Sequence, residues 1–183
     1  MFGIVVSLLT HITLSPNYGA SSGMYFMTHI KVPHGQTGMH TVGLELSLPR
    51  GIASARPEVP PGWTVNVTTY ELSLQDQYVS HGKTVTTAPD KIAWTAGTHT
   101  DGISDNNLLY IGLQLKLLCS FDDPVQTDYS GSNSIWQGQH TLWFKIEQHL
   151  LSQSESKTIA WSAALQDRTD GSSPGCGRGS QIS

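Results

Sequence analysis

The sequence is short of charged residues. Only 13% of its 183 residues are Asp, Glu, Lys or Arg, and the formal net charge is −4. Proteins that bind nucleic acid neutralise phosphates with a basic surface, so this composition argues against a nucleic-acid partner. Long hydrophobic runs are lacking as well. The longest one falls far short of the roughly 20 residues that a membrane-spanning helix needs, and no membrane span is predicted.

Cysteine is scarce, and motifs for enzyme chemistry are lacking. The two cysteines, Cys119 and Cys176, allow at most one internal disulfide, and the sequence does not establish that they meet. We interpret Cys119, which follows an apolar run, as a small buried residue and Cys176 as unpaired. The spacings of a zinc site, a phosphate-binding loop, a serine-nucleophile turn and a calcium loop are missing. The protein is therefore not expected to be an enzyme on these grounds.

What the sequence does contain is a series of short β-branched and aromatic runs, broken by Gly, Pro, Ser and Asn. This pattern predicts an all-β sandwich of about eight or nine strands with no substantial helix. The clearest run begins at Thr41: Val42, Leu44 and Leu46 alternate with polar or small residues, which places Glu45 on the face away from the core. We expect residues 55–63 to be a proline-fixed connection and residues 75–89 to be a long hairpin excursion.

Strands are predicted for the following segments: residues 11–15, 24–32, 41–51, 63–70, 91–95, 107–118, 140–149 and 158–165. A single domain over residues 11–170 fits this pattern. Residues 1–10 are apolar and are interpreted as a secretion signal, although they lack a basic start and a small-x-small cleavage pattern. Residues 171–183 are interpreted as a flexible Gly/Ser-rich tail. The glycosylation acceptor that begins at Asn66 is consistent with a secreted, extracellular protein.

His11 carries the strongest indication of chemistry. Cleavage after Thr10 would make it the first residue of the mature chain, where its α-amine and imidazole Nδ1 could chelate one metal ion. Copper(II) favours nitrogen-rich sites of this kind. Without cleavage, His11 has no free amine and the chelate cannot form. On this stretch alone, an ordinary first strand is the alternative interpretation.

The chain resembles the YcnI-like copper-binding family along most of its length. The resemblance rests on the order of several short motifs: His11-Ile12-Thr13-Leu14-Ser15-Pro16, Lys31-Val32-Pro33-His34-Gly35, Leu44-Glu45-Leu46-Ser47-Leu48-Pro49-Arg50-Gly51, Pro61-Gly62-Trp63, Ile92-Ala93-Trp94-Thr95-Ala96-Gly97, Thr141-Leu142-Trp143-Phe144 with Gln148, and Trp161. The resemblance implies a secreted immunoglobulin-like β-sandwich that binds copper(II) in copper acquisition or delivery, with another copper-transport protein as its partner. It also implies a single-histidine metal site made of His11, a carboxylate for which Glu45 is the candidate, and Trp161.

The chain departs from the family pattern at two cysteines, which are replaced by Gln36 and Leu150, and in longer inserts at residues 75–89 and 122–139. Two other functions stay open. One is a copper oxidase resembling lytic polysaccharide monooxygenases, which would need a second histidine beside His11; the candidates are His99, His140 and His149. The other is a metal-free, immunoglobulin-like adhesion module, in which Trp161 is a core aromatic and Glu45 a solvated strand residue.

Overall fold

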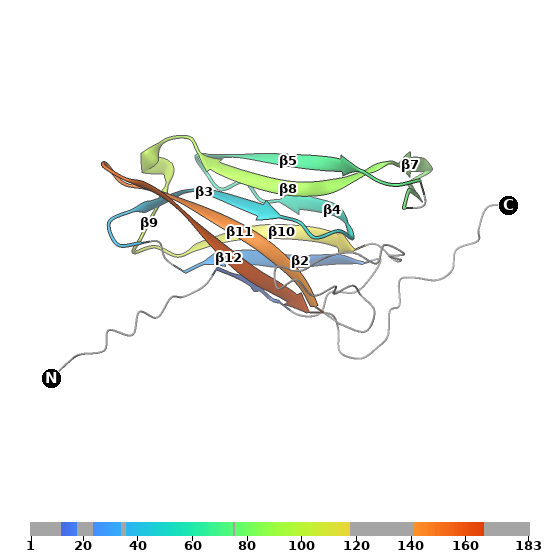
Figure 1. Ribbon diagram of the computed structural model, residues 1–183, viewed down its shortest axis with the longest axis horizontal. Coiled ribbons are helices and arrows are strands. Elements are labelled where there is room, and N and C mark those ends of the chain that lie inside the picture. The colour runs from blue at the N-terminus through green and yellow to red at the C-terminus, as the bar shows by residue number, and fades with distance from the viewer. Residues whose placement is uncertain (1–11, 18–23, 34–35, 75, 118–140, 167–183) are drawn as a thin grey trace.

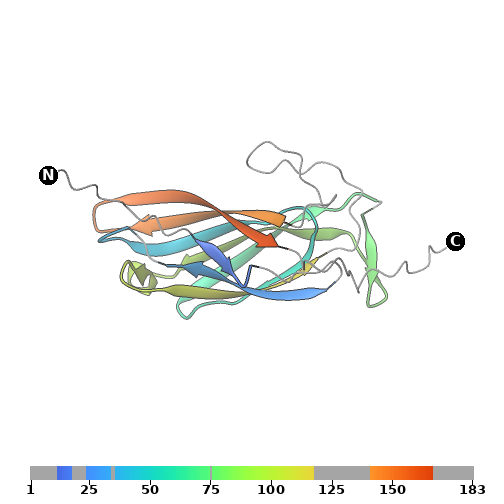
Figure 2. The same cartoon turned by 90° about the horizontal axis from the view of Figure 1, so that it is seen from below.

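The computed structural model describes residues 12–17, 24–33, 36–74, 76–117 and 141–166. These residues form a sandwich of two main antiparallel sheets (Figure 1; Figure 2). The first sheet has four strands, in the spatial order β1 (Thr13–Ser15), β2 (Tyr25–Val32), β10 (Leu109–Leu117) and β4 (Ile52–Pro57).

The second sheet has a main path of five strands, with a short sixth strand paired to β3. The path runs in the order β12 (Ser156–Gln166), β11 (Thr141–Leu151), β3 (His40–Ser47), β8 (Thr87–Ala96) and β5 (Trp63–Glu71), and the added strand is β9 (Ile103–Ser104). A separate hairpin consists of β6 (Tyr78–Ser80) and β7 (Lys83–Val85), and a 3-10 turn, η1, spans His99–Asp101. The described residues form twelve strands, more than the predicted eight or nine: nine make up the two main paths, and the short strands β6, β7 and β9 are additional.

Within the described ranges there is no α-helix, and therefore no helix long and apolar enough to cross a membrane. The core lies between the two sheets and follows the alternation of the sequence. In β3, Leu44 and Leu46 are buried while Glu45 and Ser47 are only partly covered. In β10, the odd-numbered residues from Leu109 to Leu117 all face inward. Because successive side chains of a strand point to opposite faces, β3 and β10 contribute alternate residues to this core.

The prediction for residues 55–63 is wrong in its first part, because residues 52–57 form the edge strand β4. This strand pairs with β10, from Ile52 opposite Leu117 to Pro57 opposite Leu113, across one register shift. Proline is tolerated at the edge of a sheet, where its missing N–H breaks no ladder between two strands. The β4 segment has no alternating pattern, so the sequence did not predict that it would pair with β10.

The predicted excursion at residues 75–89 is confirmed in part. Its centre is the hairpin of β6 and β7, which turns at exposed His81 and at Gly82, both with positive φ. The end of the segment, from Thr87 onward, already belongs to the long strand β8. The interpretations of His11, Cys119, His140, Cys176, the signal at residues 1–10 and the tail at residues 171–183 fall outside the described residues.

Candidate metal centre

Trp161 lies on β12, the last strand of the second sheet, and its indole packs against the core. It pairs with Ile146 of β11, which in turn pairs with Leu46 of β3, so all three side chains share the inner face of the sheet. The indole Nε1–H donates a hydrogen bond of 3.1 Å to Oε1 of Gln148. The ring is therefore held in place by packing and by a polar contact.

Gln148 links Trp161 to a second buried polar group. Its Nε2 donates to Oγ1 of Thr41 at 2.8 Å, and both Gln148 and Thr41 are 1% exposed. The two hydrogen bonds link Thr41, Gln148 and Trp161, and so join β3, β11 and β12 through their side chains. A signal for it exists in the sequence: Gln148 occupies a core-facing position in the alternation that runs through Phe144, Ile146 and Leu150. A polar residue at such a position is favourable only with hydrogen-bond partners.

The first strand meets the last one along an edge of the sandwich. β1 is the edge strand of the first sheet, β12 is the edge strand of the second, and the two contact each other. Both views show the short blue strand β1 beside the orange-red strand β12 (Figure 1; Figure 2). Ile12, the residue directly after His11 in the chain, is 1% exposed and packs in the core. The described chain thus begins at the edge that carries Trp161.

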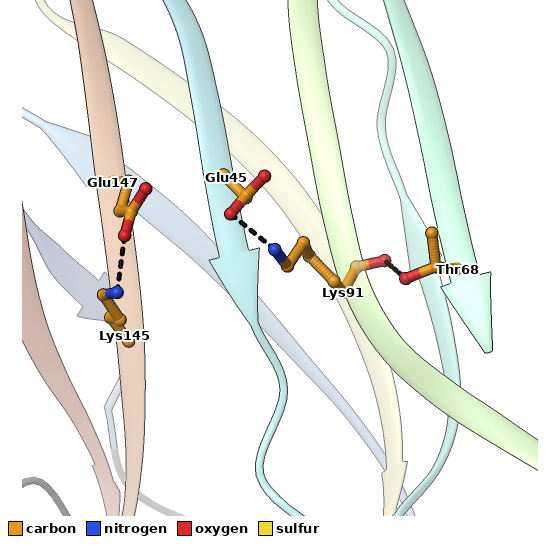
Figure 3. Close-up of polar contacts among 5 residues, drawn as sticks. All are labelled: Glu45, Thr68, Lys91, Lys145 and Glu147. Carbon is orange, nitrogen blue, oxygen red and sulfur yellow. Dashed lines mark hydrogen bonds and ion pairs between the residues drawn. The ribbon is translucent and has the colours of Figure 1, made fainter. Parts of the chain in front are cut away.

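Glu45 does not join Trp161, because the two lie on opposite faces of the second sheet. Glu45 pairs with Glu147 of β11 and with Ala93 of β8. This row of paired residues is one position away from the row of Leu46, Ile146 and Trp161, so its side chains point to the opposite face. Its Oε1 accepts a hydrogen bond of 2.7 Å from Nζ of Lys91. Figure 3 shows this ion pair on the outer face, beside that of Lys145 and Glu147. The prediction that Glu45 points away from the core is confirmed, but that position separates it from Trp161.

The outer face therefore carries two carboxylates side by side, Glu45 and Glu147, each paired with a lysine (Figure 3). Like charges directly across a strand pair repel, and Lys91 and Lys145 offset that repulsion. The hydrogen bond from Lys145 holds the pKa of Glu147 below its ordinary value of 4.5. The hydrogen bond with Glu45 raises the pKa of Lys91 above 10.5. Both pKa shifts favour the charged form of the side chain, as expected for ion pairs on a solvated face.

Replacing Glu147 with glutamine is expected to cost stability at neutral pH but not in strong acid. A carboxylate whose pKa is depressed by folding contributes stability above its ordinary pKa, and this contribution is lost as the pH falls through the folded value. The loss should stay within about 1 kcal/mol, because exposed ion pairs contribute little. Urea unfolding of the wild type and of Glu147→Gln at pH 7 and at pH 2 would measure it. A difference in stability that is the same at both pH values would contradict this prediction.

The described histidines that an oxidase site would need do not lie beside Trp161. His149 is on the outer face of β11, where its ring covers Gly43 and its Nδ1 is 3.0 Å from Oγ1 of Thr158. His99 belongs to η1 and stacks on His40, with 4.4 Å between the ring centroids. Its Nε2 is 3.3 Å from the carbonyl oxygen of Leu151. A carbonyl oxygen only accepts hydrogen bonds, so this nitrogen donates its proton there and offers no lone pair to a metal.

Comparisons with known proteins agree with the fold. An uncharacterised protein from Nocardia farcinica, whose crystal structure is described as revealing an immunoglobulin-like fold, is 20% identical to this chain. The match covers 87% of this chain and 99% of that chain, with a TM-score of 0.57. It confirms the predicted immunoglobulin-like sandwich. No curated protein matches the chain.

The match to a protein family covers far more of the chain than any single motif does. A family model described as "Domain of unknown function (DUF1775)" matches residues 11–175. The match begins at His11 and includes both sheets of the sandwich. Because it spans most of the 183 residues, the chain belongs to the DUF1775 family.

Proposed function

We propose that this protein is a secreted, YcnI-like copper(II)-binding protein that acts in copper acquisition or delivery, with His11 as the first residue of its mature chain. The observation that supports the proposal is the edge formed by β1 and β12. His11 is bonded to buried Ile12 at the start of β1, and β12 presents Trp161 along the same edge. A metal ion held by the N-terminal residue would therefore lie at an anchored strand, on the edge whose other strand carries Trp161.

The donor chemistry of this edge fits copper(II). The α-amine and the imidazole of an N-terminal His11 would supply two nitrogens, which copper(II) prefers to oxygen ligands. Trp161 cannot contribute a nitrogen lone pair, because its Nε1–H is a donor that points to Gln148. It would instead place its ring beside the ion and limit the access of water. Thr41 and Gln148 would orient the indole from behind, as outer partners commonly do around metal sites.

Glu45 is not part of the proposed ligand set. It lies on the far face of the sheet from Trp161 and is engaged by Lys91. A carboxylate ligand, if the site uses one, has to come from another residue. The proposed partner, a second copper-transport protein, would receive or supply the ion at the exposed edge, because Thr13 and Ser15 of β1 face solvent.

Copper(II) titration followed by electron paramagnetic resonance tests this function. Protein that begins at His11 should give a one-to-one copper signal with nitrogen coupling. The matched control is the same protein with its α-amine acetylated, which keeps the imidazole but removes the amine from the chelate. We expect acetylation to lower the affinity at least about tenfold and to change the spectrum.

Two results would contradict the proposal. One is a spectrum without nitrogen coupling, and the other is a spectrum that acetylation of the α-amine leaves unchanged. An affinity for copper(II) no better than millimolar would favour a metal-free adhesion module instead. Mass spectrometry of the secreted protein would show separately whether its chain begins at His11.

A further inference from the structure

The outer face of the first sheet carries an exposed methionine beside an exposed histidine. Met27 and His29 are two residues apart on β2, so their side chains leave the same face, about 6.6 Å apart along the strand. Phe26, Thr28 and Ile30 point the other way, into the core. Met27 is 53% exposed, so its thioether does not serve to fill the interior.

The imidazole of His29 is held in a defined orientation. Its Nδ1 lies 3.2 Å from the carbonyl oxygen of Ser15 on β1, and its ring meets Tyr110 edge to face, with 6.2 Å between the centroids. Since a carbonyl oxygen can only accept, the neutral ring carries its proton on Nδ1 and its lone pair on Nε2. Metal-binding histidines typically show this arrangement, in which a backbone carbonyl fixes the tautomer and leaves the other nitrogen for the ion.

The carboxylate of Glu58 lies over β10, the strand that pairs with β2 at His29. The residue that pairs with His29 on β10 is Gly112, which has no side chain on the outer face. Glu58 fills that space: its Oε2 accepts a hydrogen bond of 2.8 Å from the Gly112 N–H and lies 2.7 Å from the position a Cβ would take. Negative charge is thus fixed over Gly112, the direct neighbour of His29.

The chemistry of these groups is that of a soft-metal site. Thioether sulfur favours copper(I), and imidazole binds copper readily. No group of three or more His, Cys, Asp or Glu side chains within the described ranges could hold a metal ion, and on this face Met27 adds a thioether next to the imidazole of His29. The flexible side chain of Met27, with its three rotatable bonds, can move its sulfur toward Nε2 of His29.

We propose that Met27 and His29 bind copper(I) on the outer face of β2, with Sδ and Nε2 as the two ligands and Glu58 offsetting the charge of the ion. The site lies on the first sheet and involves neither His11 nor Trp161. It therefore does not depend on copper(II) binding at the N-terminus, although it would let one protein hold both oxidation states of the metal.

Competition for copper(I) against the chromophoric chelator bicinchoninate, without oxygen, tests the site on the full chain with Cys119 and Cys176 replaced by serine, because cysteine thiolates also bind copper(I) and would mask it. Met27→Leu keeps the size and apolar character of the side chain but removes the sulfur, and His29→Gln removes the imidazole. We expect each variant to weaken copper(I) binding at least about tenfold, since loss of even an outer partner of a metal ligand costs ~10–100-fold. Protein that begins at His11 should bind copper(I) equally well with and without acetylation of its α-amine.

Two exposed residues outside the proposed site, Met24 and His81, provide matched controls. Met24 is 48% exposed but precedes β2 and is one residue out of step with Met27, so Met24→Leu should change affinity less than twofold. His81→Asn, at the exposed β6–β7 turn, should also be neutral. Carbon-13 labelling of the methionine methyl groups adds an independent measurement, in which copper(I) should shift the Met27 signal and leave that of Met24 in place.

Copper(I) affinity unaffected by Met27→Leu, or a methyl shift at Met24 instead of Met27, would overturn the proposal. Failure to bind copper(I) at all would also overturn it. None of these results bears on the copper(II) site, whose test is the nitrogen coupling of protein that begins at His11. The two proposals can therefore fail separately.

Discussion

Replacing Phe144 with alanine is expected to lower the free energy of unfolding by about 3–5 kcal/mol, the usual cost of deleting a fully buried aromatic side chain. Phe144 is 0% exposed and lies on β11, between β12 and β3. Its partner on β12 is the small residue Ala163, which cannot fill the space that the ring would leave. Urea unfolding followed by circular dichroism would measure the loss as a lower midpoint with an unchanged slope.

The neighbouring residue provides the matched control. Trp143 is larger than Phe144 but 46% exposed, because alternation turns it to the other face of β11. Trp143→Ala should therefore cost much less, within about 1 kcal/mol. If Trp143→Ala destabilised the protein as much as Phe144→Ala, the assignment of inner and outer faces along β11 would be incorrect.

Replacing Gln148 with leucine is expected to cost about 1–3 kcal/mol, although leucine suits an apolar core. The substitution removes the acceptor of the Trp161 N–H and the donor to the Thr41 hydroxyl. Thr41 is almost fully buried, so water cannot replace the lost partner without a change in structure. A buried polar group left without its partner carries the full cost of its desolvation.

A double-mutant cycle separates this effect from simple repacking. Thr41→Val alone should destabilise, because the Nε2 group of Gln148 then loses its acceptor. In the double variant, Thr41→Val with Gln148→Leu, neither half of that hydrogen bond is left. Its total cost should thus fall below the sum of the single costs by at least about 0.5 kcal/mol. Strictly additive costs would argue against an energetic link between the two side chains.

The sequence predicted part of the fold and part of the candidate site. The alternating runs predicted most strands of the two sheets, and the same alternation correctly placed Glu45 away from the core. The edge strand β4 was missed, because residues 52–57 show no alternating pattern, although Ile52 is fully buried in the core. The copper site predicted at His11 has not been tested, since this residue lies outside the described part of the chain.

The relation between the predicted ligands could not be read from the sequence. Glu45 and Trp161 are 116 positions apart, and a shift of one residue in strand pairing would exchange the faces of a whole strand. The observed register puts Trp161 opposite Ile146 and Glu45 opposite Glu147, which separates the two side chains by the thickness of the sheet. Likewise, the alternation marks Gln148 as a buried polar residue but does not identify Thr41 and Trp161 as its partners, and the position of Glu58 over Gly112 has no local signature.

The sequence by itself determined which residues face inward, because the two-residue period of a strand is a local property of the backbone. It also determined the supply of metal-binding groups: an early histidine, few cysteines, and a methionine two residues before a histidine. Only the tertiary structure decided which of these groups can act together. Packing of the two sheets brings β1 to β12, and strand pairing brings the Ser15 carbonyl to His29 and turns Glu45 away from Trp161. These pairings depend on burying side chains from distant segments in one core, which no short stretch of sequence encodes.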